Sequence, residues 1–73
     1  MLPKPDRDPA SVLDILTAAR AIERYITNID RAAFDNDEMR QDAIMRRIEI
    51  IGEAVRRISP EFRQQHPEIQ WQQ

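Results

Sequence analysis

Aliphatic residues recur every three or four positions in the second half of the sequence, and this spacing restricts the fold more than any other feature. The series is Ile44, Ile48, Ile51, Val55 and Ile58. Steps that alternate between four and three residues are typical of a helix that packs along another helix. We therefore predict a helix over residues 38–58, with this series along its contact with a partner helix.

A second amphipathic stretch comes before it. We predict a helix from about Pro9 to Ile29, with Asp8 as the capping residue and proline in the first turn. At about 100° per residue its aliphatic side chains fall on one arc. They are Val12, Ile15, Leu16, Ala18, Ala19, Ile22, Ile26 and Ile29. Residues 30–37 are polar except for Phe34 and predict a connection, so the expected fold is an antiparallel helical hairpin.

The two ends of the chain complete an all-α prediction. Residues 1–7 contain two prolines and are expected to form an extended leader. Ser59 followed by proline is a typical helix start, which predicts a short third helix over residues 60–65. Pro67 should end it, because proline disfavours helix in the residue before it. Residues 67–71 are then expected to be extended, and residues 1–73 to form one helical domain.

Composition excludes several classes of protein. The chain has 73 residues, no cysteine, one histidine and a formal net charge of −2. These values exclude disulfide bonds, offer no zinc-type ligand spacing and give no overall electrostatic argument for nucleic-acid binding. We expect no metal or cofactor, no membrane span and a cytoplasmic location. A chain this short buries only about 60% of its unfolded surface, which predicts a partner surface.

Two charged residues fall inside the apolar arcs. Arg47 lies between Ala54 and Ile58 on the helical wheel, and Glu23 lies between Val12 and Leu16. A buried guanidinium without a partner is costly. We predict that Arg47 pairs with Glu23 between the helices or with a carboxylate of a second copy. The alternative is that each long side chain extends along the edge of its helix into water.

A second apolar strip lies beside the isoleucine series and consists of Ala43, Ile50 and Ala54. One contact series suffices for the partner helix, so we predict that this strip is a surface for a further partner. Gly52, the only glycine, lies in mid-helix, where it costs about 1 kcal/mol relative to alanine. The close approach of another backbone would explain its presence.

Arg63 and His66 are the candidates for catalysis. An arginine and a histidine on one short helix can together hold a phosphate and transfer a proton. The interpretation that we favour is structural, with His66 at the negative end of a short helix. Neither a nucleophile with a base nor a glycine-rich phosphate loop is present.

Four segments together resemble the HepT-like ribonucleases of the HEPN superfamily. They are LDILTAARAI at residues 13–22, RRIEIIGEA at 46–54, ISPEF at 58–62 and HPEIQW at 66–71. The resemblance implies a helical bundle that forms a homodimer and belongs to a toxin–antitoxin pair. It also implies metal-independent RNA cleavage by an arginine and a histidine that meet across the dimer cleft. The implied antitoxin is a minimal nucleotidyltransferase that adds AMP to a tyrosine just beyond that histidine.

In the family, the tryptophan that corresponds to Trp71 leads into the helix with the catalytic arginine and histidine. This sequence ends two residues later, so Arg63, His66 and Tyr25 do not inherit the family roles. We expect a truncated, nuclease-inactive form that self-associates as a homodimer or binds a full-length relative, with RNA as substrate only if the missing helix is supplied. One alternative is a weakly active ribonuclease that uses Arg46, Arg47 or Arg63 with His66. The other is a small helical adaptor that docks a protein partner.

Overall fold

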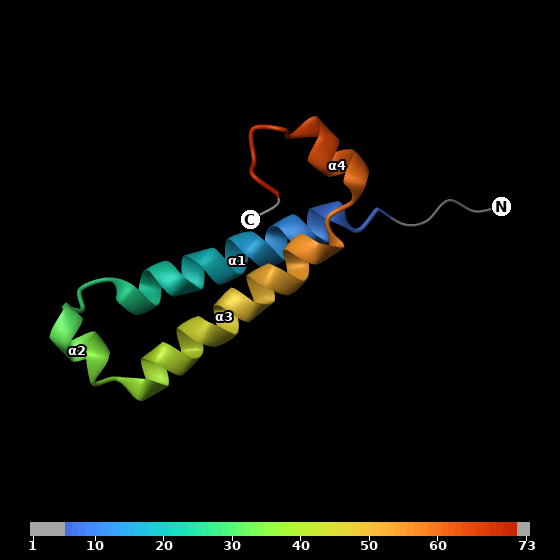
Figure 1. Cartoon of the computed structure of the whole chain (residues 1–73). Helices are drawn as coiled ribbons and strands as arrows, with labels where there is room; N and C mark the ends of the chain where they lie inside the picture. The colour runs from blue at the N-terminus through green and yellow to red at the C-terminus, as the bar shows by residue number, and fades with distance from the viewer. Residues whose placement is uncertain (1–5, 72–73) are drawn as a thin grey trace.

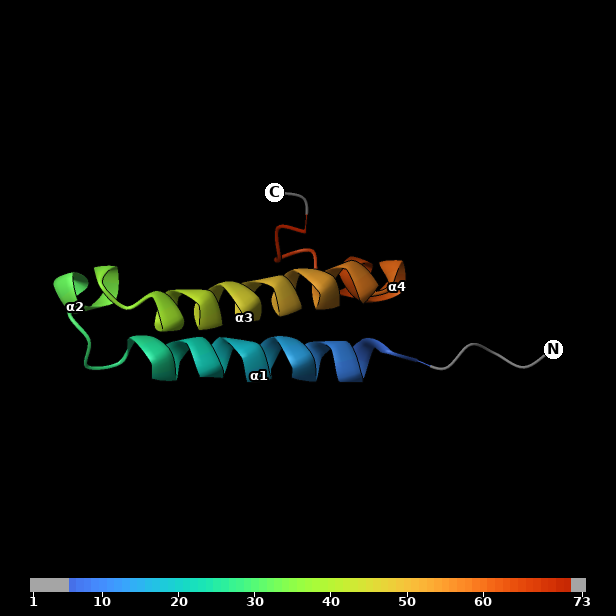
Figure 2. The same cartoon turned by 90° about the horizontal axis from the view of Figure 1, so that it is seen from below.

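The computed structural model describes residues 6–71, and every regular element in that part of the chain is a helix. The helices are α1 (Asp8–Ile26), α2 (Arg31–Asp35), α3 (Glu38–Arg57) and α4 (Pro60–Gln65). α1 and α3 run side by side in opposite directions, with α2 at one end of the pair and α4 at the other (Figures 1 and 2). The all-α hairpin with a short terminal helix is thus confirmed. Residues 1–5 of the expected leader lie outside the described residues.

The first helix is shorter than predicted, and the connection is more ordered. α1 ends at Ile26 instead of Ile29, because Asn28 takes a left-handed backbone conformation with φ of 61°. The Asp30 side chain then accepts a hydrogen bond of 2.8 Å from the Ala33 amide. This aspartate caps α2, so the predicted polar connection contains a helical turn.

The most deeply buried residues of α1 and α3 are alanines. The most deeply buried apolar residues in the described part are Ala18, Ala21, Ala54 and Ile58. Ile48, which the sequence placed in the contact series, is 53% exposed. The contact side of α3 is therefore rotated from the predicted series toward Ala54. Short alanine side chains let two helices lie close together, and that close packing leaves the larger aliphatic residues at the sides.

A clamp at the α2 end holds the hairpin together. Asp37 caps α3 by accepting a hydrogen bond from the Arg40 amide at 2.9 Å. The Arg40 guanidinium donates to the Tyr25 carbonyl of α1 at 3.0 Å. Gln41 donates to the Phe34 carbonyl of α2 at 2.8 Å. The first turn of α3 thus binds both preceding helices.

The described fold is elongated and thin, with extents of 55 × 25 × 17 Å. One helix is about 10–12 Å across with its side chains, so the hairpin is a single layer of helices. Large aliphatic residues stay exposed on it, namely Val12, Leu13, Leu16, Ile26, Met39, Met45, Ile48 and Ile69. Among the described helices, none has the length and apolar content needed to cross a membrane.

Candidate functional site

A carboxylate at the start of α1 has a different role from the predicted one. Asp8 is only 9% exposed and is the first residue of α1, preceded by Arg7 as the capping position. Its amide donates to the Asp6 side chain at 3.0 Å. Its own carboxylate accepts hydrogen bonds from the Ser59 amide at 2.9 Å and from the Ser59 hydroxyl at 2.6 Å. The predicted capping role of Asp8 was wrong, because its side chain accepts hydrogen bonds from Ser59, the residue before α4, instead of from amides of α1.

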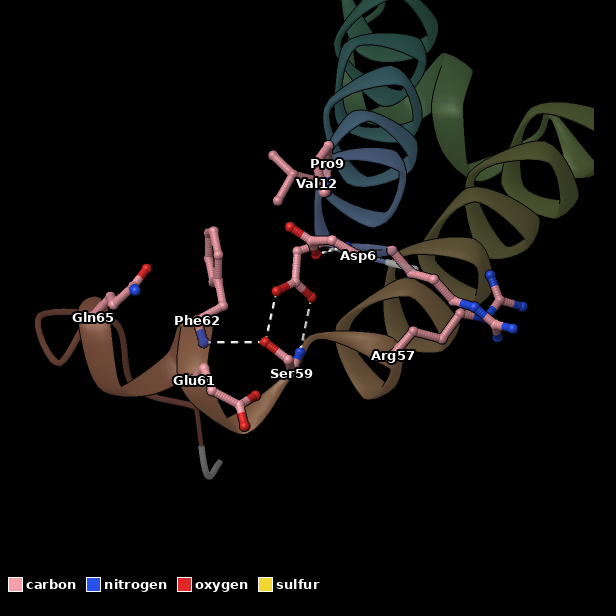
Figure 3. Close-up of a pocket in the computed structure, with 10 residues that line it drawn as sticks. Asp6, Pro9, Val12, Arg57, Ser59, Glu61, Phe62 and Gln65 are labelled. Atoms are coloured by element: carbon pink, nitrogen blue, oxygen red, sulfur yellow. Dashed lines mark hydrogen bonds between the residues drawn. The ribbon is translucent and has the colours of Figure 1, made fainter. Parts of the chain in front are cut away.

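Ser59 caps α4, as the sequence predicted. Its hydroxyl oxygen accepts a hydrogen bond of 3.1 Å from the Phe62 amide while it donates to Asp8. Figure 3 shows this hydrogen-bonded chain as dashed lines. The carboxylate lies in the first turn of α1, where the helix dipole favours negative charge. The Asp8 carboxylate and the Ser59 amide and hydroxyl thus hold the start of α4 against the start of α1. No local sequence signal indicates this contact.

A pocket of about 1000 Å³ lies between these two helix starts. Its walls are formed by Asp6, Arg7, Asp8, Pro9, Val12, Arg57, Ser59, Glu61, Phe62 and Gln65. Val12 and Pro9 lie on the α1 side and Phe62 and Gln65 on the α4 side, while Arg57 points away from the space between them (Figure 3). Its charged residues have both signs, and no group of three or more metal-binding side chains occurs within residues 6–71.

The Arg63 side chain contacts α3 and Trp71. Its guanidinium donates to the Val55 carbonyl of α3 at 2.8 Å and lies 5.5 Å from the centre of the Trp71 ring. Its Nε atom is buried and has no hydrogen-bond partner among the described residues. The side chain therefore joins α4 to the last turns of α3 and lies against an aromatic ring.

His66 is also held by its neighbours. It is the C-cap of α4, which agrees with the structural interpretation of the sequence. Its ring packs against the Phe62 ring, with 4.6 Å between the ring centres. Nδ1 lies 3.0 Å from the Glu68 carboxylate. The pKa of the Glu68 carboxyl is lowered first by a hydrogen bond from the Glu68 backbone amide and second by the hydrogen bond from the His66 ring.

Residues 67–71 are not extended, in contrast to the prediction. The Ile69 amide donates to the His66 carbonyl at 3.2 Å and closes a turn. The Trp71 indole donates to the same carbonyl at 3.0 Å. Its ring meets the Phe62 ring edge-on, with 6.2 Å between ring centres. The His66 carbonyl at the end of α4 thus accepts hydrogen bonds from two later residues, and residues 66–71 form a compact turn.

The structure does not bring Glu23 and Arg47 together. Glu23 is exposed and Arg47 is half-buried. No ion pair or hydrogen bond joins Arg47 to any residue in the range 6–71. Glu23 lies on the exposed side of α1, away from the buried Ala18 and Ala21, so it does not face α3. Pairing of Arg47 with a carboxylate of a second copy stays a prediction.

The predicted partner strip is partly covered within the hairpin. Ala54 is 1% exposed, and Ala43 and Ile50 are half-buried. A Cβ atom added at Gly52 would find only the Arg56 guanidinium within 4 Å, at 3.6 Å. The expected close approach of a backbone to Gly52 is therefore wrong for the described part of the chain. The role of Ala43 and Ile50 toward a partner stays a prediction.

The model of the family "Ribonuclease HepT-like" matches residues 15–73. A protein of Methanocaldococcus jannaschii named "Putative RNase MJ1380" is 38% identical over 64 residues, which are 88% of this chain and 59% of that protein. "Probable ribonuclease HepT" of Thermococcus cleftensis is 40% identical over 60 residues, which are 82% of this chain and 54% of that protein.

The chain thus spans little more than half the length of these curated relatives. Its match includes most of α1 and all of the later helices. No solved structure matches it. The resemblance of the four segments is confirmed, and the chain belongs to the HepT-like ribonuclease family.

Proposed function

We propose that the 73-residue chain is a non-cleaving member of the HepT-like ribonuclease family, which acts by self-association or by binding a longer family protein. Its relatives are named as RNases, and this chain spans 59% and 54% of two of them. RNA is thus the substrate class that family membership supports. The lack of cleavage that we propose rests on the way Arg63 and His66 are held by their neighbours.

The environment of Arg63 and His66 is the observation that carries this proposal. The Arg63 guanidinium donates to a backbone carbonyl of α3 and lies against Trp71. His66 packs on Phe62 and approaches Glu68. A phosphate-binding arginine must offer its guanidinium to the ligand, and a general acid or base must reach the reacting group. Both side chains instead stabilise the end of α4.

The proposed setting is a toxin–antitoxin pair, with a nucleotidyltransferase as the antitoxin. This setting follows from family membership alone. Tyr25 lies in α1 at the α2 end of the hairpin, half-buried, and its carbonyl accepts a hydrogen bond from Arg40. We do not expect an antitoxin to transfer AMP to this tyrosine, which lies in a different helix from the modified tyrosine of the family.

The test is RNA cleavage by the purified 73-residue chain and its His66→Ala variant. The longer Thermococcus cleftensis relative serves as the reference protein under identical conditions. Neither form of the chain should cleave RNA above the rate in buffer. Cleavage by the chain that disappears in His66→Ala would overturn the proposal and support the weakly active alternative. Cleavage by both forms would overturn it as well, with the reacting groups elsewhere in the chain.

A further inference from the structure

Residues 59–71 form a unit that is held together by its own contacts, and we call this unit the lid. The His66 amide donates to the Arg63 carbonyl at 3.2 Å. The Trp71 indole donates to the His66 carbonyl at 3.0 Å. The Phe62 ring contacts the rings of both His66 and Trp71. Backbone and side-chain contacts thus join α4 to the turn that follows it.

Hydrogen bonds from Ser59 and Arg63 attach the lid to the hairpin. The Ser59 amide and hydroxyl donate to the Asp8 carboxylate at 2.9 and 2.6 Å. The Arg63 guanidinium donates to the Val55 carbonyl at 2.8 Å. Two of these bonds converge on one carboxylate, which is largely buried because Asp8 is only 9% exposed. A change at this single carboxylate therefore weakens the attachment at the start of α4.

The connection from α3 to the lid has the backbone conformation of a hinge. Ile58 is the C-cap of α3, and its amide donates to the Val55 carbonyl. Its side chain is 4% exposed and thus anchored in the hairpin. Ile58 and Ser59 are both extended, with ψ angles of 131° and 153°. Rotation about these two ψ angles breaks no hydrogen bond within α3, so the residues at the end of this helix can absorb a movement of the lid.

The lid depends on its attachment for its order. α4 has six residues, whereas isolated helices shorter than about 12–15 residues are marginal in water. Ser59 and Arg63 lie one helical turn apart, so loss of the Ser59 contact with Asp8 also weakens the hold of Arg63 on α3. Local regions with few contacts to the rest of a protein open as cooperative units. The lid is therefore either docked and ordered or released as a whole.

The lid also forms one wall of the pocket of about 1000 Å³. Four of its side chains line this space, namely Ser59, Glu61, Phe62 and Gln65. Pro9 and Val12 of α1 lie on the opposite side (Figure 3). Release of the lid removes its wall of the pocket and exposes the apolar start of α1. Access to Pro9 and Val12 is thus coupled to the contact between Asp8 and Ser59.

We propose that the lid opens as one unit while α1 and α3 stay packed, with the Asp8 carboxylate as its latch. Ala18 and Ala54 are each 1% exposed and mark the packing of the two long helices. The hydrogen bond from Arg40 to the Tyr25 carbonyl holds the opposite end of the hairpin. None of these residues belongs to the lid. The opening is separate from the proposed function, because it requires neither RNA nor a partner.

Hydrogen exchange of the 73-residue chain, followed by NMR at several urea concentrations, tests whether the lid is a unit. The reporters in the lid are the His66 amide and the Trp71 indole, and those in the hairpin are the Ala18 and Ala54 amides. We expect the lid reporters to exchange at least tenfold faster than the hairpin reporters, after correction for intrinsic rates. Exchange in the lid should depend weakly on urea and exchange in the hairpin steeply, because unfolding the hairpin exposes more surface.

Asp8→Ala tests the latch. It should accelerate exchange of the His66 amide and the Trp71 indole by the same factor, at least tenfold, although neither group bonds to Asp8. Asp14→Ala removes an exposed carboxylate of the same helix and is the control. This variant should leave both exchange rates within about twofold of the wild type.

Several outcomes overturn the proposal. Equal exchange rates with equal urea dependence in lid and hairpin would show one unfolding unit, and acceleration of a single lid reporter in Asp8→Ala would show that the lid is not a unit. No acceleration in Asp8→Ala, or an equal one in Asp14→Ala, would exclude the latch. If Asp8→Ala does not fold, the urea dependence of the wild type decides the matter. RNA cleavage enters none of these measurements, so the non-cleaving function is decided separately.

Discussion

Asp8 and Ser59 are 51 residues apart in the sequence and form two hydrogen bonds, of 2.9 and 2.6 Å. The carboxylate of α1 accepts both, and Ser59 also caps α4. The contact joins the start of α1 to the start of α4, at the end of the hairpin opposite α2 (Figure 1). Together with the hydrogen bond from Arg63 to the Val55 carbonyl, this pair holds α4 and the turn after it against the hairpin.

Replacing Asp8 with alanine should loosen α4. The Ser59 amide and hydroxyl lose their acceptor, and a buried hydrogen-bonding group without a partner costs about 1–3 kcal/mol. Trp71 fluorescence, followed through urea unfolding, should report a loss of stability of that size. Asp8→Asn should cost less, because it keeps an acceptor oxygen. Asp14→Ala, an exposed carboxylate of the same helix, is the control, and an equal effect of Asp14→Ala would contradict the account.

Gly52→Ala should stabilise the hairpin by about 1 kcal/mol, the usual advantage of alanine over glycine inside a helix. The added Cβ meets only the Arg56 guanidinium, at the ordinary contact distance of 3.6 Å. The urea midpoint of the purified chain measures the change. A lower urea midpoint would contradict this prediction. It would indicate that a second backbone approaches Gly52, as the sequence suggested.

Glu68 should titrate at lower pH in the folded chain than in urea. Its pKa is lowered by a hydrogen bond from its own amide and then by the His66 ring. A group with a lowered folded pKa stabilises the fold above its unfolded pKa, and this contribution disappears as the pH falls through the folded value. Side-chain NMR of Glu68 measures both titrations. His66→Ala should raise the folded pKa only part of the way, since the amide is the larger cause. Identical titrations in the folded and unfolded states would disprove the contact.

Local patterns predicted the helices well. The three-to-four spacing of isoleucines predicted α3, the Ser59–Pro60 pair predicted the start of α4, and Pro67 predicted its end. The rotation of α3 could not be read from the same pattern. Which residues face α1 depends on how closely two helices approach, and the alanines Ala18, Ala21 and Ala54 decide this. A helical wheel of α3 alone favours its largest aliphatic residues as the contact side, so it placed Ile48 in the contact instead of Ala54.

The failures at the candidate site have two physical causes. Asp8 looked like a local cap because proline follows it, whereas its partner is 51 residues away in the sequence. The pairing of Glu23 with Arg47 was inferred from two wheels without their relative rotation. The turn after Pro67 depends on the His66 carbonyl, which accepts from two later residues. Partners distant in the sequence decided the first two cases, and hydrogen bonds between residues three and five positions apart decided the third, which the proline pattern does not predict.

The family residues between Arg63 and Trp71 build the end of the described fold, and we propose that they do not cut RNA. The most direct measurement is RNA cleavage and thermal unfolding of the wild-type chain and Arg63→Ala, side by side. The account predicts no cleavage by either protein and a lower thermal midpoint for Arg63→Ala, which loses the Val55 carbonyl and the Trp71 ring. RNA cleavage by the wild-type chain that Arg63→Ala abolishes, with an unchanged midpoint, would contradict it.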